Sequence, residues 1–333
     1  MSDSETFSAL ILRETENGRY RPAFEQLGLD DLPEGDVLVA VEYSSLNYKD
    51  GLAITGKGRI VRKLPLIPGI DLAGRVMEST AAAFAPGDPV LLTGYGVGEE
   101  HCGGYAQRAR LWSEWLVPMP NGLDSRRAMA IGTAGFTAML CIMALEDGGI
   151  TPDRGPVVVT GAAGGVGSLA VMLLARLGYE VAAVTGRPET HDFLRDLGAS
   201  EMIDRETMSA AARALETQRW AGAVDTVGST TLARVLAETM MDGTVTACGL
   251  AGGADLPATV MPFILRGVRL QGISSVQTGM SRRRAAWDRL AMELPLDKLD
   301  ALITEVPLSS ILEQGENILA GRIRGRTVVD VNR

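Results

Sequence analysis

The segment from Gly161 to Gly167 contains four glycines and gives the most specific chemical signal in the chain. A short apolar, β-branched run precedes it at 157–160, and a helix is expected from Ser168 to Leu177. Small residues between a strand and a helix let backbone N–H groups approach a pyrophosphate, and the helix N-terminus adds partial positive charge. Ala162 stands where the usual pattern has its first glycine, so a merely tight connection is the alternative. In this strand–turn–helix context, the segment predicts a dinucleotide site.

The end of the next predicted strand indicates which nicotinamide cofactor is bound. An Asp or Glu about 20 residues after the glycine turn would bind the ribose hydroxyls and select NAD. Thr185, Gly186 and Arg187 stand there instead, and this hydroxyl, open backbone N–H and guanidinium suit a 2′-phosphate. We therefore expect NADPH, although Glu189 follows closely. Arg205, after the third strand, either reaches the same phosphate or is simply solvated.

A second set of polar residues lies in the first third of the chain. Asn47 and Tyr48 follow one predicted strand, and Asp71 begins the next. Reduction of a carbon–carbon double bond conjugated to a carbonyl needs donors to the developing enolate oxygen and a source of protons. Asn47 and Tyr48 are candidate donors, Tyr48 is a candidate proton relay, and Asp71 is a candidate for ordering the loop. The alternative is that Asn47 and Asp71 only cap turns while Tyr48 packs.

Positive charge gathers near these residues. Three of the chain's four lysines and two arginines fall within residues 49–63, which carry a net charge of +4. Such a patch on an acidic protein steers anionic ligands, or else is a solvated surface. Lys57, Arg59, Arg62 and Lys63 are candidates for holding the phosphates of a coenzyme A ester. A second cluster at Arg282–Arg284 is a candidate for the same role or for the cofactor phosphates.

Composition excludes several other classes of protein. The 333 residues carry a formal charge of −9, which argues against nucleic acid as the main partner. Two His and three scattered Cys do not build a closed zinc site; the first domain offers only the adjacent His101 and Cys102, so we expect no metal. The odd, widely spaced thiols also indicate a reducing compartment, and the acidic N-terminus does not resemble a signal peptide. Residues 128–145 are uncharged but rich in small residues, so a buried helix is favoured over a membrane span.

The pattern of predicted elements divides the chain into two parts. Residues before about 126 are strand-like and turn-rich, with no long helical stripe. After about 128, strands and helices alternate, which indicates a parallel, doubly wound sheet. The segment from Ala285 to Ala320 is expected to be mainly helical, before a final strand at Arg326–Asp330. The predicted fold class is therefore α/β, with a separate β-rich domain.

Long stretches of the sequence resemble the medium-chain dehydrogenase/reductase superfamily, and within it the zinc-free acryloyl-CoA reductases often described as quinone oxidoreductases. The resemblance covers essentially the whole chain. Its distinctive runs are Ser44–Asp50, Leu52–Gly58, Ile67–Asp71, Leu92–Glu99, Ile131–Cys141, Trp220–Gly228 and Met261–Arg266. Zinc-dependent relatives place Cys and His-Glu where this chain has Asn47 and Ile70–Asp71, which agrees with a metal-free site.

The resemblance implies a GroES-like catalytic domain at 1–127 and 273–333 and a Rossmann NADPH-binding domain at 128–272. It also implies a homodimer. A cytoplasmic location and no membrane partner are expected from the acidic N-terminus, the scattered thiols and the small-residue content of 128–145. Carried over position by position, the cofactor contacts would be Tyr48, Ala163, Gly164, Gly165, Val166, Thr185, Gly186, Arg187, Arg205, Leu250, Ile264 and Ser275.

The expected reaction is NADPH-dependent reduction of acryloyl-CoA to propanoyl-CoA, with hydride passing to the β-carbon. Such an activity would remove acrylate formed in dimethylsulfoniopropionate or 3-hydroxypropanoate metabolism. One alternative is an NADPH-dependent quinone or general enone reductase. A nucleotide-binding protein that has lost catalysis is another. The basic segment at 49–63 discriminates, because a quinone reductase has no need of phosphate-binding side chains there.

Overall fold

A computed structural model describes residues 6–333 and divides the chain into two compact units. Unit 1 comprises residues up to Thr133 together with Val276–Ala285 and Leu299–Arg333. Unit 2 comprises Ala134–Ser275 and Ala286–Lys298. The predicted architecture, a β-rich domain and a doubly wound α/β domain, is confirmed.

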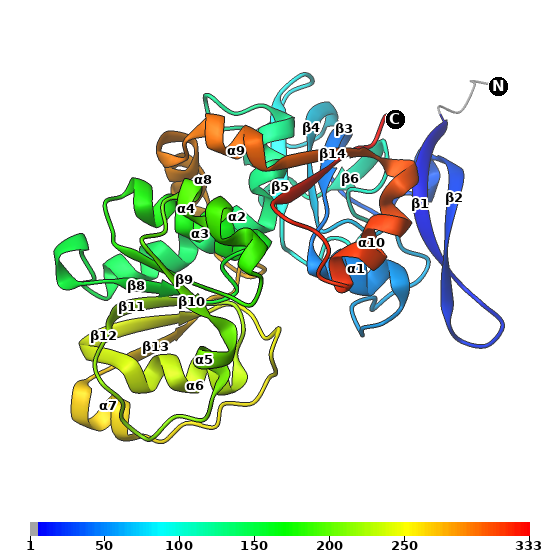
Figure 1. Ribbon diagram of the computed structural model, residues 1–333. Helices are drawn as coiled ribbons and strands as arrows, with labels where there is room; N and C mark the ends of the chain where they lie inside the picture. The colour runs from blue at the N-terminus through cyan, green and yellow to red at the C-terminus, as the bar shows by residue number, and fades with distance from the viewer. Residues whose placement is uncertain (1–5) are drawn as a thin grey trace, which may run out of the picture. The chain divides into compact units, whose positions relative to one another are not determined.

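Unit 1 is built on largely antiparallel strands (Figure 1). Their buried side chains form one hydrophobic core. A two-stranded hairpin of β1 (Thr6–Glu14) and β2 (Tyr20–Gly28) precedes a seven-stranded sheet. The strands of that sheet are β3 (Val37–Ser45), β4 (Asp71–Ser79), β5 (Pro89–Thr93), β6 (Arg108–Leu111), β7 (Val117–Pro118), β14 (Ile303–Pro307) and β15 (Arg326–Asp330). Strand β3 pairs with β4, β6 and β15, so the C-terminal strand joins the sheet next to the segment that ends at Ser45.

Two elements of unit 1 depart from the predicted pattern. Helix α1 (Tyr48–Thr55) lies in the part expected to be without helices, and α10 (Ile311–Leu319) packs beside it. Strand β14 interrupts the segment expected to be mainly helical, because it pairs in parallel with β15. Both elements are short, and tertiary partners rather than a local periodic pattern define them.

Unit 2 contains a six-stranded parallel sheet with the strand order β10-β9-β8-β11-β12-β13. The strands are β8 (Val157–Val159), β9 (Val181–Thr185), β10 (Glu201–Asp204), β11 (Trp220–Asp225), β12 (Thr239–Ala247) and β13 (Arg269–Gly272). The helices are α3 (Gly165–Arg176), α4 (His191–Leu197), α5 (Arg205–Ser209), α6 (Ser229–Glu238) and α7 (Met261–Arg266). The order reverses between β8 and β11, and doubly wound sheets bind ligands at the carboxyl ends of the strands beside such a switch point.

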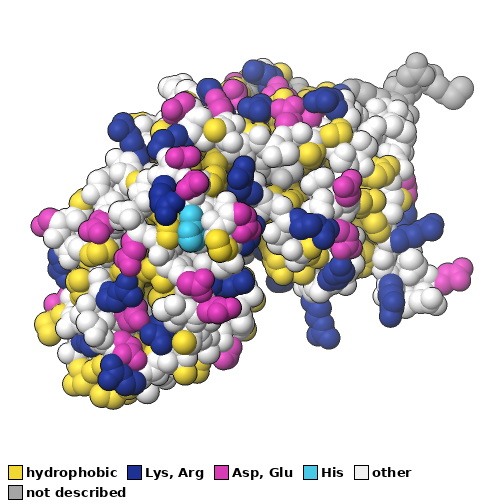
Figure 2. Space-filling view, in the orientation of Figure 1, with side chains coloured by type: hydrophobic (Ala, Val, Ile, Leu, Met, Phe, Trp, Pro, Cys, Tyr) yellow, Lys and Arg dark blue, Asp and Glu magenta, His cyan; other side chains and the backbone are white. Residues whose placement is uncertain are grey.

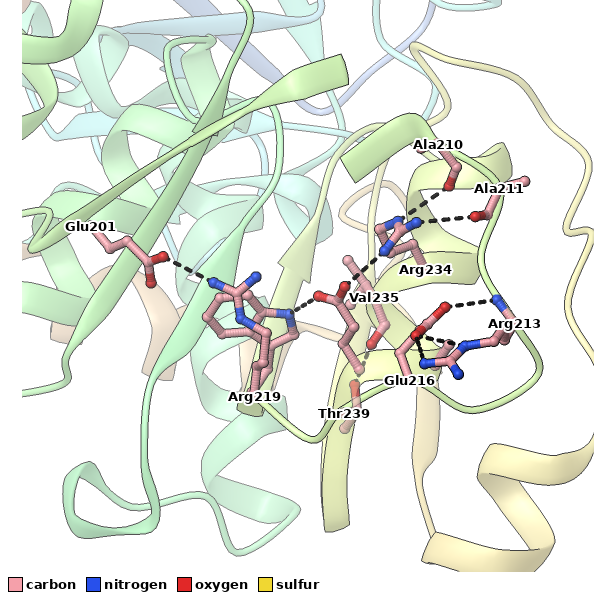
Figure 3. Close-up of polar contacts among 12 residues, drawn as sticks. Glu201, Ala210, Ala211, Arg213, Glu216, Arg219, Arg234, Val235 and Thr239 are labelled. Carbon is pink, nitrogen blue, oxygen red and sulfur yellow. Dashed lines mark hydrogen bonds and ion pairs between the residues drawn. The ribbon is translucent and has the colours of Figure 1, made fainter. Parts of the chain in front are cut away.

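A network of arginines and carboxylates fixes the chain around β11 and α6 (Figure 3). Arg234 donates to the carbonyls of Ala210 and Ala211 and to Glu238, which accepts from the indole N–H of buried Trp220. The Arg219 guanidinium lies 4.3 Å from the centre of that indole and pairs with Glu201. This network orders the irregular segment between α5 and β11.

Helix α2 (Ser125–Asp147) is long and apolar enough to cross a membrane, but 89% of its most apolar window is buried inside the protein. The predicted buried core helix is therefore confirmed. The helix is broken at Gly132, where φ is +50° and ψ is −159°.

The helices α8 (Met280–Glu293) and α9 (Leu296–Leu302) lie between β13 and β14 in the chain. Residues 286–298 group with unit 2, whereas the resemblance implied that they belong to the GroES-like domain. The Trp287 ring stacks on Phe136 with centroids 6.2 Å apart, and Arg289 pairs with Glu146. These contacts with the later part of α2 explain the grouping.

Candidate active site

Two of the three predicted catalytic residues of unit 1, Asn47 and Asp71, meet in a buried polar network at the start of α1. Strand β3 ends at Ser45, Asn47 is the N-cap of α1, and Tyr48 is its first residue. Asp71 begins β4, which pairs with β3 and therefore lies beside Ser45 and Asn47. The structure thus brings Asn47 and Asp71 into direct contact.

Asp71 is fully buried and accepts four hydrogen bonds. Its Oδ2 accepts from the Ser45 hydroxyl at 2.6 Å, from Asn47 Nδ2 at 2.9 Å and from the Thr133 N–H at 2.8 Å. Its Oδ1 accepts from the Thr133 hydroxyl at 2.5 Å. A buried carboxylate is tolerated when its oxygens are bonded in this way, so Asp71 holds β3, α1 and the break in α2 together.

Gly132 makes this contact with α2 possible. A Cβ at this position would lie 2.6 Å from Asp71 Oδ2 and 2.9 Å from an Arg326 guanidinium nitrogen. The positive φ of Gly132 also disfavours any residue with a side chain. The glycine therefore serves both the backbone turn and the close approach of Asp71 and Arg326.

Asp50 is a second fully buried carboxylate in the network. Its Oδ2 accepts from the Asn47 backbone N–H at 2.9 Å and from Asn47 Nδ2 at 3.2 Å, and its Oδ1 accepts from the Ile70 N–H. Burial and then the charge of Asp71 raise the pKa of Asp50 to about 7, against the lowering effect of these hydrogen bonds. Asp50 thus titrates near neutrality while it anchors the first turn of α1.

Arg326 supplies the buried cation of the network. Only 3% of its surface is exposed; its Nε donates to the Ala130 carbonyl at 2.7 Å, and its guanidinium also contacts Asn47 Oδ1 at 3.4 Å. Burial lowers the pKa of Arg326, opposed by the charges of Asp71 and Asp50. The Asn47 amide therefore lies with its oxygen toward a cation and its nitrogen toward two carboxylates, which fixes its orientation.

The two predicted donors to a substrate oxygen, Asn47 and Tyr48, differ in how accessible they are to a ligand. Asn47 is 9% exposed, and its amide nitrogen has three acceptors within 3.2 Å for two hydrogens. Its position favours the capping role that the sequence left open for it. Tyr48 is 55% exposed, so its hydroxyl is the donor that remains accessible.

The basic segment is partly neutralised by neighbouring carboxylates. Lys57 pairs with Glu316 at 2.6 Å, and Lys49 pairs with Glu99 at 2.7 Å. Arg59, Arg62 and Lys63 are exposed. These three are therefore the better candidates for an anionic ligand.

The second basic cluster does not present three arginines to solvent. Arg283 is fully buried, donates to the carbonyls of Thr93, Val276 and Thr278, and lies 4.5 Å from the centre of the Tyr95 ring. The Arg283 part of the predicted phosphate cluster is wrong, because this guanidinium is used to hold the segment around 276–278 against β5. Arg282 and Arg284 are exposed.

In unit 2, the glycine turn lies at the carboxyl end of β8, as predicted. Ala163 is buried, whereas Gly164, Gly165 and Val166 lie at the accessible start of α3. At the carboxyl end of the neighbouring β11, buried Asp225 accepts from the Thr160 hydroxyl and the Gly228 N–H, and burial raises its pKa. The turn therefore leaves its backbone open to a ligand beside an ordered sheet edge.

The residues expected at a 2′-phosphate lie at the ends of the next two strands. The Arg187 guanidinium donates to the Ala163 carbonyl at 3.2 Å, which connects the end of β9 to the glycine turn. A Cβ on Gly186 would lie 2.5 Å from Arg205 Nε, so the Arg205 guanidinium rests directly on the Gly186 backbone. The structure thus brings Gly186, Arg187 and Arg205 together, and two guanidiniums next to a turn fit a phosphate.

The remaining predicted cofactor contacts are spread over unit 2. Leu250 follows β12 and is 67% exposed, and Ile264 on α7 is 73% exposed. Ser275 is half-buried just after β13. Their contact with a cofactor stays a prediction from the resemblance.

Comparison with known proteins relates these sites to a family. An alcohol dehydrogenase GroES-like domain model matches residues 33–121, and a zinc-binding dehydrogenase model matches residues 165–292. The chain is 56% identical over 328 residues to the acrylyl-CoA reductase AcuI of Ruegeria pomeroyi, covering 98% of this chain and 99% of that protein. The chain belongs to the medium-chain dehydrogenase/reductase family.

Two further members of this family are similar along nearly their whole length. The putative quinone oxidoreductase YhfP of Bacillus subtilis is 47% identical over 305 residues, covering 91% of this chain and 92% of that protein. The crystal structure of the yhdH oxidoreductase of Salmonella enterica in complex with NADP superimposes with a TM-score of 0.95 at 55% identity, covering 97% of this chain and 99% of that one.

The zinc that the description of one family model implies does not fit the residues of this medium-chain dehydrogenase/reductase. The resemblance matched Asn47 and Asp71 to zinc ligands of zinc-dependent relatives. In this structure the Asn47 amide nitrogen and the Asp71 carboxylate are bonded to each other and to neighbouring groups. The neighbouring Arg326 guanidinium contacts Asn47 Oδ1, and a cation at this place disfavours a metal ion. Zinc prefers thiolate, imidazole or carboxylate ligands, and no three such side chains converge within residues 6–333.

Four members of the network, Ser45 among them, were missed from the sequence. Asp50 carried a signal, since Asn47 and Asp50 have the spacing of a capping box at a helix start. Thr133 follows Gly132 inside an apolar stretch, and Arg326 begins a strand near the C-terminus. No local pattern links these two residues to Asp71.

Proposed function

We propose that this protein is an NADPH-dependent acryloyl-CoA reductase that forms propanoyl-CoA and removes acrylate in dimethylsulfoniopropionate or 3-hydroxypropanoate metabolism. The observation that carries this proposal is the 56% identity to acrylyl-CoA reductase AcuI, which extends over nearly the full length of both chains. The exposed Arg59, Arg62 and Lys63, in the same unit as the candidate catalytic network, support an anionic thioester substrate.

The residues of unit 2 fit the proposed cofactor. The open glycine turn would hold the pyrophosphate, and Arg187 and Arg205 would hold the 2′-phosphate. NADPH supplies a hydride when bound. The proposal is supported by the NADP complex of the Salmonella enterica yhdH oxidoreductase.

The residues of unit 1 would handle the charge and the proton. The Tyr48 hydroxyl donates a hydrogen bond to the thioester oxygen, whose negative charge grows as the enolate forms. A proton from solvent, relayed by the Tyr48 hydroxyl, is then transferred to the α-carbon and completes the reduction. Asn47 and Asp71 hold the start of α1, and with it Tyr48, in place.

Loss of Arg187 should change cofactor preference. The Arg187→Ala variant should raise the KM for NADPH by about 10-fold or more, because a charge-assisted bond to phosphate contributes roughly 1.5–3 kcal/mol. The KM for NADH, which lacks the 2′-phosphate, should change little. Steady-state kinetics with both cofactors checks this; an equal change in both KM values would contradict a phosphate role.

An alternative substrate is a quinone, which the name of the Bacillus subtilis relative suggests. The exposed Arg59 and Arg62 discriminate between the two substrates, because benzoquinone has no phosphate. The Arg59→Ala/Arg62→Ala variant should raise the KM for acryloyl-CoA roughly 10-fold by removing two exposed phosphate contacts. The KM for benzoquinone should stay unchanged. Arg21→Ala, at an exposed arginine on the β1–β2 hairpin, is the matched control.

We also propose that the protein is a homodimer. Strand β13 ends the six-stranded sheet with most of its residues exposed, and α7 carries exposed apolar side chains beside it. Figure 2 shows apolar side chains gathered over this part of unit 2, and Val260, Ile264 and Leu265 are among those exposed. A second copy of the same edge would pair the open strand and cover these side chains.

A charge in this apolar patch should disrupt the dimer. The Leu265→Glu variant would place a carboxylate in the contact, so light scattering after gel filtration should give a monomer mass. Met292→Glu, at an exposed apolar residue on α8, should leave the dimer intact. A monomeric wild-type protein would reject the proposal.

The proposed location is the cytoplasm. The three cysteines are free thiols, which agrees with a reducing compartment. Fractionation of cells with a reductase assay checks this.

A further inference from the structure

Asp50 and Asp71 are two fully buried carboxylates joined through one amide nitrogen. Asn47 Nδ2 lies 3.2 Å from Asp50 Oδ2 and 2.9 Å from Asp71 Oδ2. Asp71 receives four hydrogen bonds, of which three come from hydroxyl or backbone donors at 2.8 Å or less. Asp50 receives its shorter bonds from two backbone N–H groups only. Of the two, Asp50 is therefore the less well compensated carboxylate.

The charged and titratable groups that face Asp50 come from three elements. Strand β4 contributes Asp71, β15 contributes Arg326, and the loop before β6 contributes Tyr105, whose hydroxyl donates to the Ser45 carbonyl. The Arg326 guanidinium donates to two neutral oxygens, the Ala130 carbonyl and Asn47 Oδ1, and interacts with Asp71 and Asp50 through its charge. One cation thus faces two buried carboxylates. Two carboxylates at such a short separation, buried away from water, do not both ionise at neutral pH.

We propose that Asp50 is a positioning residue that carries a proton in the working enzyme, and that loss of this proton limits turnover at alkaline pH. This inference rests on the proposed reductase function. It concerns a residue outside the three to which we assigned catalytic roles.

Asp50 affects turnover by holding the first turn of α1, where Tyr48 lies. The Asn47 N–H and the Ile70 N–H both donate to Asp50, so Asp50 closes the helix turn that begins at Tyr48 and ties it to the strand of Asp71. Ionisation adds a second negative charge that repels Asp71 across Asn47. The same charge opposes the negative charge that develops on a substrate oxygen held by Tyr48.

The pH dependence of kcat tests this inference. Burial and the charge of Asp71 raise the pKa of Asp50 to about 7, so the protonated form dominates at pH 6 and the ionised form at pH 8.5. With saturating NADPH and acryloyl-CoA, wild-type kcat should fall about 30-fold between these values, following the protonated fraction. In Asp50→Asn, which copies the neutral form, kcat at the two pH values should agree within about 3-fold. Asp30→Asn, at an exposed carboxylate, should keep the wild-type fall.

Two kinetic results would overturn the inference: a wild-type kcat that does not fall with pH, or an Asp50→Asn variant whose kcat falls as the wild-type kcat does.

If the variant does not fold, infrared difference spectra of the wild-type holoenzyme between pH 6 and 8.5 test the inference instead. Loss of a protonated carboxyl band, kept in an Asp225→Asn background, supports the inference, and its absence rejects it. Asp225 is the appropriate background because burial raises its pKa too. A protein that turns over no acryloyl-CoA at any pH contradicts the proposed function instead, and the infrared band still tests Asp50.

Discussion

Replacing Arg326 with Met is expected to lower the free energy of unfolding by about 3–5 kcal/mol, the usual cost of leaving a buried charge without its partner. Met preserves the aliphatic volume but leaves Asp50 and Asp71 without a neighbouring cation. It also removes the donors to the Ala130 carbonyl and to Asn47 Oδ1. Thermal unfolding should show a Tm lower by roughly 10 °C. Arg322→Met, at an exposed arginine in the loop before β15, should shift Tm little.

The loss of unfolding free energy in Arg326→Met should depend on pH and on Asp50. Because the pKa of Asp50 is raised from 3.8 to about 7 in the folded protein, its stabilising contribution is complete below pH 4 and is lost as pH rises through 7. Arg326→Met should therefore be destabilised more at pH 8.5 than at pH 6. Adding Asp50→Asn removes one of the two carboxylates and should restore part of the loss. A double variant no more stable than Arg326→Met at pH 8.5 would show that charge does not explain the effect.

Replacing Tyr48 with Phe is expected to lower kcat for acryloyl-CoA about 100-fold, in the range typical for loss of one oxyanion donor or general acid. The ring remains, so the KM values should change little, and the buried network behind α1 loses none of its hydrogen bonds. Stopped-flow measurement of NADPH oxidation under single-turnover conditions would isolate the chemical step from product release.

Tyr43→Phe provides the matched control for this measurement. Tyr43 is on β3 in the same unit, and removal of its hydroxyl should leave kcat unchanged. A Tyr48→Phe enzyme with wild-type single-turnover rates would remove this hydroxyl from the mechanism. An accessible backbone N–H would then be the remaining kind of donor to the substrate oxygen.

The features predicted correctly from the sequence are those whose signal lies within a short, continuous stretch of residues. The glycine turn, the strands on either side of it and the Thr185–Arg187 strand end are local patterns, and each lies where expected. Helix α1 was missed because its eight residues contain no long apolar stripe. Strand β14 was missed because its pairing with β15, and not its composition, defines it.

The site itself was only partly predictable for a similar reason. Asn47 and Asp71 were identified by residue type and by their places at strand ends. What they do depends on Thr133 and Arg326, which distant segments of the chain bring to them. The positive charge of residues 49–63 was evident from the sequence, but Lys49 and Lys57 pair with Glu99 and Glu316 from elsewhere in the chain. Local composition does not contain such pairings.

The most direct test of the proposed function compares three electron acceptors under identical conditions. NADPH oxidation by the wild-type enzyme would be followed with acryloyl-CoA, crotonyl-CoA and a benzoquinone, and the thioester product would be identified by mass spectrometry. The proposed function predicts the highest kcat/KM with acryloyl-CoA and one propanoyl-CoA formed for each NADPH consumed. A kcat/KM for benzoquinone above that for acryloyl-CoA, or NADPH consumption without propanoyl-CoA, would contradict it.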